Sequence, residues 1–195
     1  MVSFCKHINK SGQWLHYGRS GRGVAIGFAS SIAATVKYDL VEVDYQIDSQ
    51  RTRMLRLLQV GAAALEKDLQ SVPPQQRAAI ARRTAHIVAI HVPILAVQMK
   101  HPSFAEEEEW RMFAHYMSLN GKRLEKGAQR REIKFRKSGE RIVPYEELNF
   151  GGDGPLPIKE VVLGQMSPIS TDAARLLLLE SSTDVAVKRS DVPVR

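Results

Sequence analysis

Four consecutive glutamates, Glu106 to Glu109, stand directly before Trp110 and Arg111. If this segment is extended, the two-residue period of a strand places Glu107, Glu109 and Arg111 on one face. Two close carboxylates repel, so one of them keeps its proton more readily, while the arginine holds the nearer one ionised. We therefore take Glu107, Glu109 and Arg111 as candidate catalytic residues. The alternative is a solvent-facing Glu–Arg ladder at the start of a strand, which would contribute little to stability.

A second group of candidates lies near the N-terminus, where Trp14 and Tyr17 are one helical turn apart and Arg19 follows them. Gly21 and Gly23 would allow the backbone to approach a ligand closely. No Gly-Lys-Ser/Thr follows, and the glycines precede a predicted strand rather than a helix, so neither a P-loop nor a dinucleotide fingerprint is present. The candidate ligand-binding residues are Trp14, Tyr17, Arg19 and Gly23, which could form a nucleotide or phosphate rim. The alternative for the two aromatic residues is core packing.

Basic residues are concentrated between residues 122 and 137, in a chain with a formal net charge of +7. They are Lys122, Arg123, Lys126, Arg130, Arg131, Lys134, Arg136 and Lys137. Such a cluster favours a polyanionic partner, and the candidate nucleic-acid contacts are Arg130, Arg131, Lys134 and Arg136. A solvated hairpin with basic flanks and a protein-binding module are the alternatives.

Several classes of protein are disfavoured by the sequence. His86 and His91 are five residues apart, whereas two metal ligands on one helix face need a spacing of four, so we expect no metal site. The single cysteine, Cys5, cannot form an intramolecular disulfide, which fits a reducing compartment. The longest apolar stretch, near residues 82–97, is too short and too polar for a membrane span, and no secretion signal is visible. We therefore expect a cytoplasmic protein.

The pattern of apolar residues and turn residues predicts an α+β fold with a mixed or mostly antiparallel sheet. Predicted strands cover residues 2–5, 23–28, 40–45, 109–117, 131–136, 140–145 and 158–164, and a C-terminal helix–strand unit covers residues 167–190. A helical hairpin, residues 48–95, is inserted between strands. We expect residues 1–195 to form a single domain.

The predicted hairpin consists of two helices, each with an apolar stripe. Leu58, Ala62, Leu65 and Leu69 recur at helical spacing in the first helix. The second helix begins after Pro73 and Pro74 and carries Ile80, Thr84, Ile87, His91 and Ile94 on one face. We expect the two helices to pack as a hairpin against the sheet.

The order of these motifs resembles the prokaryotic family called domain of unknown function 2971. The resemblance covers essentially the whole chain. The family's motif positions fall on Phe4, Trp14, Tyr17, Gly23, Phe28, Glu107, Glu109, Trp110, Arg111, Gly164, Ser190, Pro193 and Arg195. Members usually begin earlier, with a His-Tyr-Thr segment and a later Asn-Asp-Pro-x-Glu, and neither occurs here. The resemblance therefore implies that this chain lacks the family's N-terminal segment.

The resemblance does not bring an activity with it, but the late Glu-x-Glu is similar to the arrangement in ADP-ribosyltransferases. That similarity implies an enzyme that transfers ADP-ribose or cleaves NAD, in a toxin or phage-defence setting. Glu109 would then be the electrostatic catalyst, Glu107 would assist the acceptor, and Arg111 would orient the carboxylate. NAD would be the substrate. The alternative is a non-catalytic module that binds nucleic acid or protein through residues 122–137.

Overall fold

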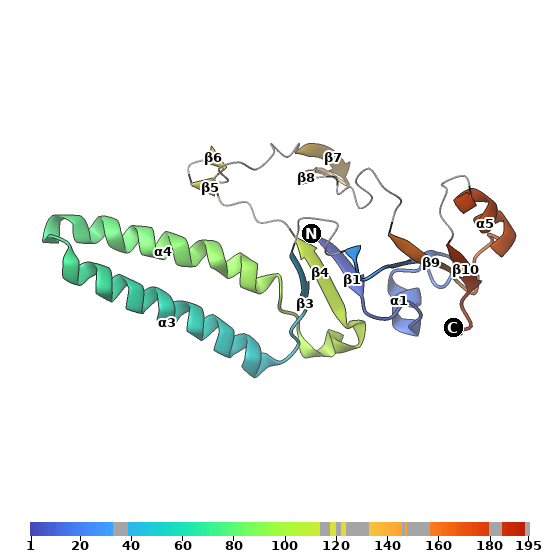
Figure 1. Ribbon diagram of the computed structural model, residues 1–195, viewed down its shortest axis with the longest axis horizontal. Coiled ribbons are helices and arrows are strands. Elements are labelled where there is room, and N and C mark those ends of the chain that lie inside the picture. The colour runs from blue at the N-terminus through green and yellow to red at the C-terminus, as the bar shows by residue number, and fades with distance from the viewer. Residues whose placement is uncertain are drawn as a thin grey trace. The chain divides into compact units, whose positions relative to one another are not determined.

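The computed structural model of the chain describes residues 1–32, 39–113, 118–119, 122–123, 133–145, 147, 157–179 and 185–193 (Figure 1). Helices occur together with strands that pair mostly antiparallel, so the predicted α+β class is confirmed. No helix within these ranges combines the length and the apolar character needed to cross a membrane.

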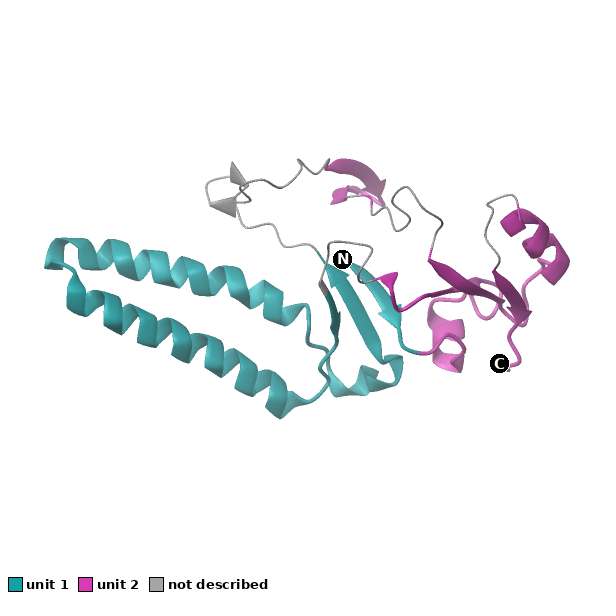
Figure 2. Cartoon of the chain, in the orientation of Figure 1, with its two compact units in different colours: residues 1–6, 40–115 teal, residues 7–39, 116–195 magenta. Residues whose placement is uncertain are grey.

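The chain forms two compact units, each made of two separate stretches of sequence (Figure 2). Unit 1 contains residues 1–6 and 40–115, and unit 2 contains residues 7–39 and 116–195. The single domain expected from the sequence stays a prediction, and the two units are described one at a time below.

Unit 1 contains a three-stranded sheet whose middle strand is β4 (Glu109–Phe113). Strand β1 (Val2–Cys5) pairs with it antiparallel, and β3 (Asp39–Glu42) lies on its other side. The register places Ser3 opposite Arg111 and Cys5 opposite Glu109, so these four side chains share one face of the sheet. Met112, on the other face, is completely buried. The middle strand is therefore covered on both faces, one of which carries charged residues.

The helical hairpin of unit 1 consists of α3 (Ile47–Ser71) and α4 (Pro74–Ala96), which pack against each other. Gly61 allows a close approach, because a Cβ at this position would lie 2.5 Å from Cγ2 of Val88. Both helices are where the sequence predicts them. The expectation that the sheet covers their apolar stripes is wrong, since no side chain of either helix is buried.

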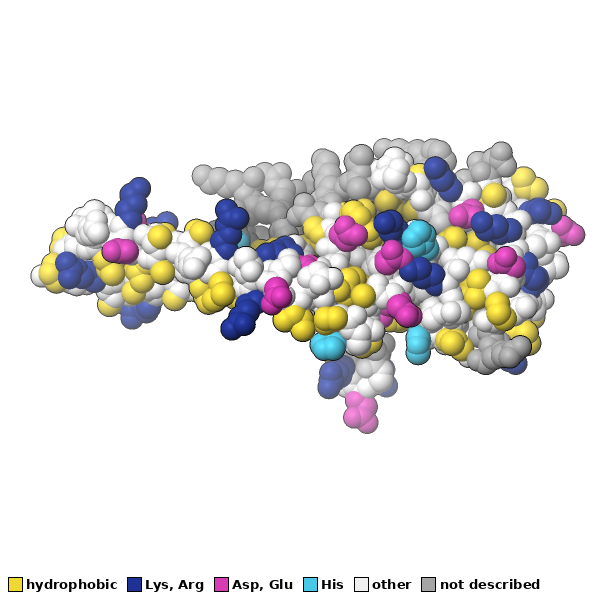
Figure 3. Space-filling view, turned by 90° about the horizontal axis from the view of Figure 1, so that it is seen from below, with side chains coloured by type: hydrophobic (Ala, Val, Ile, Leu, Met, Phe, Trp, Pro, Cys, Tyr) yellow, Lys and Arg dark blue, Asp and Glu magenta, His cyan; other side chains and the backbone are white. Residues whose placement is uncertain are grey.

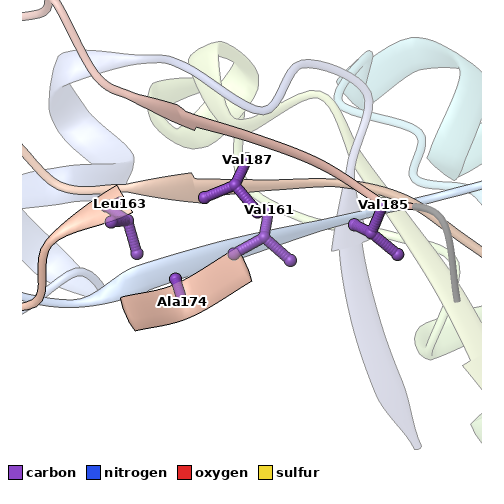
Figure 4. Packing of buried hydrophobic residues seen from close by; sticks show 5 residues of the cluster. All are labelled: Val161, Leu163, Ala174, Val185 and Val187. Atoms are coloured by element: carbon purple, nitrogen blue, oxygen red, sulfur yellow. The ribbon is translucent and has the colours of Figure 1, made fainter. Parts of the chain in front are cut away.

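Unit 2 is built on a three-stranded sheet with β9 (Ile158–Leu163) in the middle. Strand β2 (Val24–Phe28) pairs with β9 antiparallel, and β10 (Ala186–Arg189) pairs with it parallel. Helices α1 (Ser11–His16) and α5 (Thr171–Leu179) complete the unit. Its apolar core is formed by Val161, Leu163, Ala174, Val185 and Val187 (Figure 4). The connection from β9 through α5 to β10 is the helix–strand unit that the sequence predicts.

Two small two-stranded sheets belong to the second half of the chain. Strands β5 (Ser118–Leu119) and β6 (Lys122–Arg123) form one, and strands β7 (Lys134–Ser138) and β8 (Arg141–Tyr145) form the other. Gly139, with a φ of +60°, lies in the tight turn between β7 and β8.

Candidate functional site

The acidic run does not form one continuous strand. Residues Pro102–Glu107 form the 3₁₀ helix η1, Glu108 ends it in a left-handed conformation (φ 42°, ψ 54°), and β4 begins only at Glu109. The expectation that strand periodicity places Glu107 beside Glu109 is therefore wrong. The proline at the start of η1 favours a helical turn, and the left-handed residue reverses the chain direction before the strand.

Glu109 and Arg111 do share a strand face, as their spacing predicts, and their side chains form a two-pronged ion pair. Arg111 Nε donates to Glu109 Oε1 and Arg111 Nη2 donates to Glu109 Oε2, both at 2.9 Å. The remaining Nη1 donates to the carbonyl of Val97 at 2.6 Å, in the segment that follows α4. This fork geometry fixes the orientation of the carboxylate.

Lys100, which no sequence motif marks, joins the two candidate glutamates. Its Nζ donates to Glu107 Oε2 at 2.6 Å and to Glu109 Oε2 at 3.0 Å. The backbone of Lys100 is held by β-type pairing, since its amide donates to the Asp44 carbonyl at 3.1 Å. Glu107 and Glu109 are thus brought together by a shared cation and not by strand register. A lysine seven residues before Glu107 carries no sequence signal for this contact, because the intervening 3₁₀ turn was not predicted.

The electrostatics of Glu109 follow from its position. Its residue is only 4% exposed, and burial alone would raise its pKa, but hydrogen bonds from Arg111, the Ser3 hydroxyl and Lys100 lower the pKa from 4.5 to about 2. Burial acts to lower the pKa of Lys100, because it disfavours the charged amine. The hydrogen bonds to Glu107 and Glu109 outweigh this effect, so the pKa of Lys100 is raised. The expectation that repulsion keeps one carboxylate protonated is thus wrong for Glu109, because a cation lies between the two acidic groups.

Tyr45 closes the other side of Glu109. The backbone amide of Glu109 donates to the Tyr45 hydroxyl at 3.0 Å, and the amide of Val43 donates to the Glu109 carbonyl at 2.9 Å. Burial raises the pKa of Tyr45, so its hydroxyl stays protonated at neutral pH. The sequence predicts Tyr45 only as the last residue of the strand 40–45, and no motif marks it.

The chemistry open to this cluster is electrostatic. Glu109 is ionised at neutral pH and both of its oxygens accept hydrogen bonds, so it is a poor proton acceptor. Its negative charge can instead stabilise positive charge that develops nearby. The side chains of Lys100 and Glu107 are 20% and 18% exposed, against 5% for Glu109, so a ligand from solvent meets the Lys100–Glu107 end first.

The predicted ligand-binding aromatic residues of unit 2 separate into a buried one and an exposed one. Trp14 is 2% exposed, and its Nε1 donates to Asn9 Oδ1 at 2.8 Å. The Ser190 hydroxyl donates to the same oxygen at 2.6 Å, which ties the first helix to the C-terminal strand. Trp14 therefore packs in the core, which is the alternative to its predicted role in ligand binding. Tyr17 is exposed, and its ligand-binding role stays a prediction.

The glycines of unit 2 allow two backbone segments of the chain to approach each other closely. A Cβ on Gly164 would lie 2.1 Å from the Gly21 carbonyl, and the Gly164 amide donates to the Gly23 carbonyl at 3.0 Å. The Gly23 amide donates to Gly18 at 2.8 Å. Arg19 lies in the same turn with a φ of 49°. These contacts explain why glycines occur here, and binding of a phosphate by Arg19 and Gly23 stays a prediction.

Of the predicted nucleic-acid contacts, Arg130 and Arg131 lie outside the described residues. Lys134 and Arg136 are on β7, where Lys134 Nζ contacts Glu147 at 2.7 Å and the Arg136 guanidinium lies 6.0 Å from the centre of the Tyr145 ring. No group of three or more His, Cys, Asp or Glu side chains suited to a metal ion occurs among the residues that the structure describes.

The family model described as Protein of unknown function (DUF2971) matches residues 13–112, just over half of the chain. This range contains Lys100, Glu107, Glu109 and Arg111. No curated protein and no solved structure matches the chain.

Proposed function

This chain belongs to the family described as Protein of unknown function (DUF2971), and we propose that it cleaves the N-glycosidic bond of NAD, as an ADP-ribosyltransferase or an NAD glycohydrolase. The observation that carries the proposal is the ionised Glu109, which has a pKa of about 2 and is linked through Lys100 to a second carboxylate, Glu107. The proposal includes a cytoplasmic, prokaryotic setting in which NAD loss serves a toxin or phage-defence effector.

The reaction places a specific demand on the protein. When the bond between ribose C1′ and the nicotinamide nitrogen breaks, its electron pair leaves with nicotinamide and positive charge develops on the ribose. A permanently ionised carboxylate next to the ribose stabilises that charge. The oxygen of water or of an acceptor group then bonds to C1′, and its proton passes to the second carboxylate, Glu107, and from there to solvent.

Access to Glu109 requires Lys100 to move. Lys100 Nζ lies closer to Glu107, at 2.6 Å, than to Glu109, at 3.0 Å. If Lys100 shifts entirely to Glu107, an oxygen lone pair of Glu109 becomes available to a ribose hydroxyl while Arg111 still orients the carboxylate. Lys100 therefore has the role of a positioning residue in this proposal.

The test compares two variants from the same acidic run. We expect the wild type to release nicotinamide from NAD, and Glu109→Gln to lose activity by roughly a hundredfold or more, as when a key electrostatic group is removed. Glu106→Gln is the matched control, because Glu106 belongs to the same acidic run but is exposed, whereas Glu109 is buried, and it should keep its activity. Circular dichroism confirms that each variant is folded at the assay temperature. The proposal fails if the wild type neither releases nicotinamide nor gains thermal stability with NAD.

A second candidate function, nucleic-acid binding, is favoured by the register of β7 and β8. Pairing of Lys134 with Tyr145 and of Ser138 with Arg141 places Lys134, Arg136, Arg141 and Tyr145 on one face of this hairpin. A basic face with an aromatic ring suits phosphates and bases. We expect Arg136→Glu to weaken binding to RNA or DNA and to reduce its salt dependence, while Lys137→Glu, on the opposite face, changes binding less. Equal effects of the two substitutions, or no binding by the wild type, would exclude this hairpin face.

A further inference from the structure

Helix α3 carries an apolar stripe beside Gly61, the residue at which it approaches α4. Leu55, Leu58, Ala62, Leu65 and Leu69 follow each other at alternating intervals of three and four residues, which is the heptad spacing of a coiled-coil seam. We call these five residues the outer seam. Gly61, which lets α3 and α4 approach, is not one of them.

The outer seam is open to solvent within the hairpin. Leu55 and Leu58 are 49% and 50% exposed, Ala62 is exposed, and Leu65 and Leu69 are only partly covered. Hydrophobic side chains are visible along the surface of the hairpin in Figure 3, which is seen from the side on which α3 lies. Single exposed leucines are common, but five seam positions without a buried residue leave a face that a second helix would cover.

Charge along the helix indicates what that second helix is. The N-terminal half of α3 contains Asp48, Arg51, Arg53 and Arg56, which sum to +2, and its C-terminal half contains Glu66, Lys67 and Asp68, which sum to −1. A second copy of α3 running antiparallel sets the acidic half of one copy against the arginines of the other. A parallel copy would set halves of like net charge against each other.

The distribution of side-chain size fits the same arrangement. Ala62 is in the middle of the outer seam, with two leucines on each side. Two antiparallel copies that cross near Ala62 bring small residues together at the crossing and leucines together at both ends. A hairpin side about 37 Å long and about 20 Å wide offers roughly 700 Å², close to the ~800 Å² that each partner buries in a standard interface. We propose that two copies of this chain associate through the outer seam of α3 as an antiparallel four-helix bundle.

The first experiment measures the mass of the full chain in solution by sedimentation equilibrium over a range of concentrations. We expect a dimer, and we expect Leu58→Glu to raise the dissociation constant on the order of a hundredfold by burying a charge in the seam. Val60→Glu is the matched control, since Val60 is 61% exposed on the same helix but outside the seam, and it should remain dimeric. A monomeric wild type, or equal effects of Leu58→Glu and Val60→Glu, would overturn the proposal.

The second experiment tests the antiparallel direction and does not depend on a destabilising variant. Single cysteines at exposed positions 63 and 70 carry spin labels, with Cys5 replaced by serine. In an antiparallel dimer that crosses near residue 62, the two labels at position 63 lie about 3 Å apart along the helix axis and the two at position 70 about 24 Å apart, so the distance at position 70 is clearly longer. Equal distances at the two positions would indicate a parallel dimer and would refute the proposed arrangement.

Discussion

At the scale of single residues, the charge on Glu109 depends on its partners. A buried carboxylate is costly unless cations and hydrogen-bond donors compensate for the loss of water, and Arg111, Lys100 and Ser3 provide that compensation. The compensation is strong enough to hold the pKa near 2. The same contacts that stabilise the fold therefore supply the ionised group on which the proposed chemistry depends.

This depressed pKa predicts how stability depends on pH. The pKa of Glu109 is lower in the folded chain, about 2, than its ordinary value of 4.5, so the unfolded chain takes up the proton first as pH falls. The stabilisation is complete above about pH 4.5 and is lost as pH falls towards 2, by roughly 3 kcal/mol for such a shift. Urea unfolding of the wild type and of Glu109→Gln at several pH values between 7 and 2.5 measures this loss. Parallel curves for the two proteins would contradict it.

Replacing Arg111, the principal partner of Glu109, should lower the free energy of unfolding more than replacing both members of the ion pair. Arg111→Gln leaves a buried carboxylate with fewer donors, and we expect it to lower the free energy of unfolding by roughly 3–5 kcal/mol. In the double variant Arg111→Gln with Glu109→Gln, two amides replace the ions, so much of this loss should be recovered. Chemical unfolding of the wild type, both single variants and the double variant completes the cycle. A double variant less stable than Arg111→Gln alone would show that the ion pair does not set the cost.

At the scale of elements, the hairpin α3–α4 depends on one residue without a side chain. Gly61 has an unfavourable helix propensity, but a Cβ there would lie 2.5 Å from a methyl group of Val88, whose β-branched side chain is stiff. The close contact of the two helices therefore offsets the propensity cost of glycine.

Gly61→Ala should consequently lower the melting temperature of the chain, although alanine is the better helix former by about 1 kcal/mol. Val88→Ala removes the obstructing methyl groups, so adding it to Gly61→Ala should make the alanine at position 61 favourable. Thermal unfolding followed by circular dichroism at 222 nm compares the four proteins. If Gly61→Ala raises the melting temperature on its own, the two helices can move apart at no cost and their contact does not require a glycine.

The elements were largely predictable from sequence, and the site was predictable only in part. Period and turn residues placed the strands around Val2, Val24 and Ile158 and both helices of the hairpin. The pairing of Glu109 with Arg111 followed from strand spacing. The left-handed conformation of Glu108 could not be predicted, because glutamate has no preference for it, and the contacts of Lys100 depend on that reversal.

At the scale of the whole molecule, the chain passes between the two units three times, near residues 6, 39 and 115. Neither unit is a continuous stretch of sequence, so neither can be produced by simple truncation. If the chain is a single domain, as the sequence predicts, it should unfold in one cooperative transition.

The two tryptophans of the chain provide the measurement, because Trp14 belongs to unit 2 and Trp110 to unit 1. In Trp110→Phe, fluorescence follows unit 2, and in Trp14→Phe it follows unit 1. In each variant, we expect the urea concentration at the midpoint of the fluorescence transition to equal that at the midpoint of the circular dichroism transition. Separate midpoints within one variant would show that the units unfold independently.

The four charged groups around Glu109 also constrain how the sequence can change over time. Lys100, Glu107, Glu109 and Arg111 sum to zero charge and share hydrogen bonds, so replacing one leaves its partners with an unmatched charge. A protein in which only one of these four residues is replaced should be less stable. A protein in which several are replaced together avoids the unmatched charge. Divergent relatives should therefore either retain this set of residues or replace it as a group, and positions 100, 109 and 111 should vary in concert.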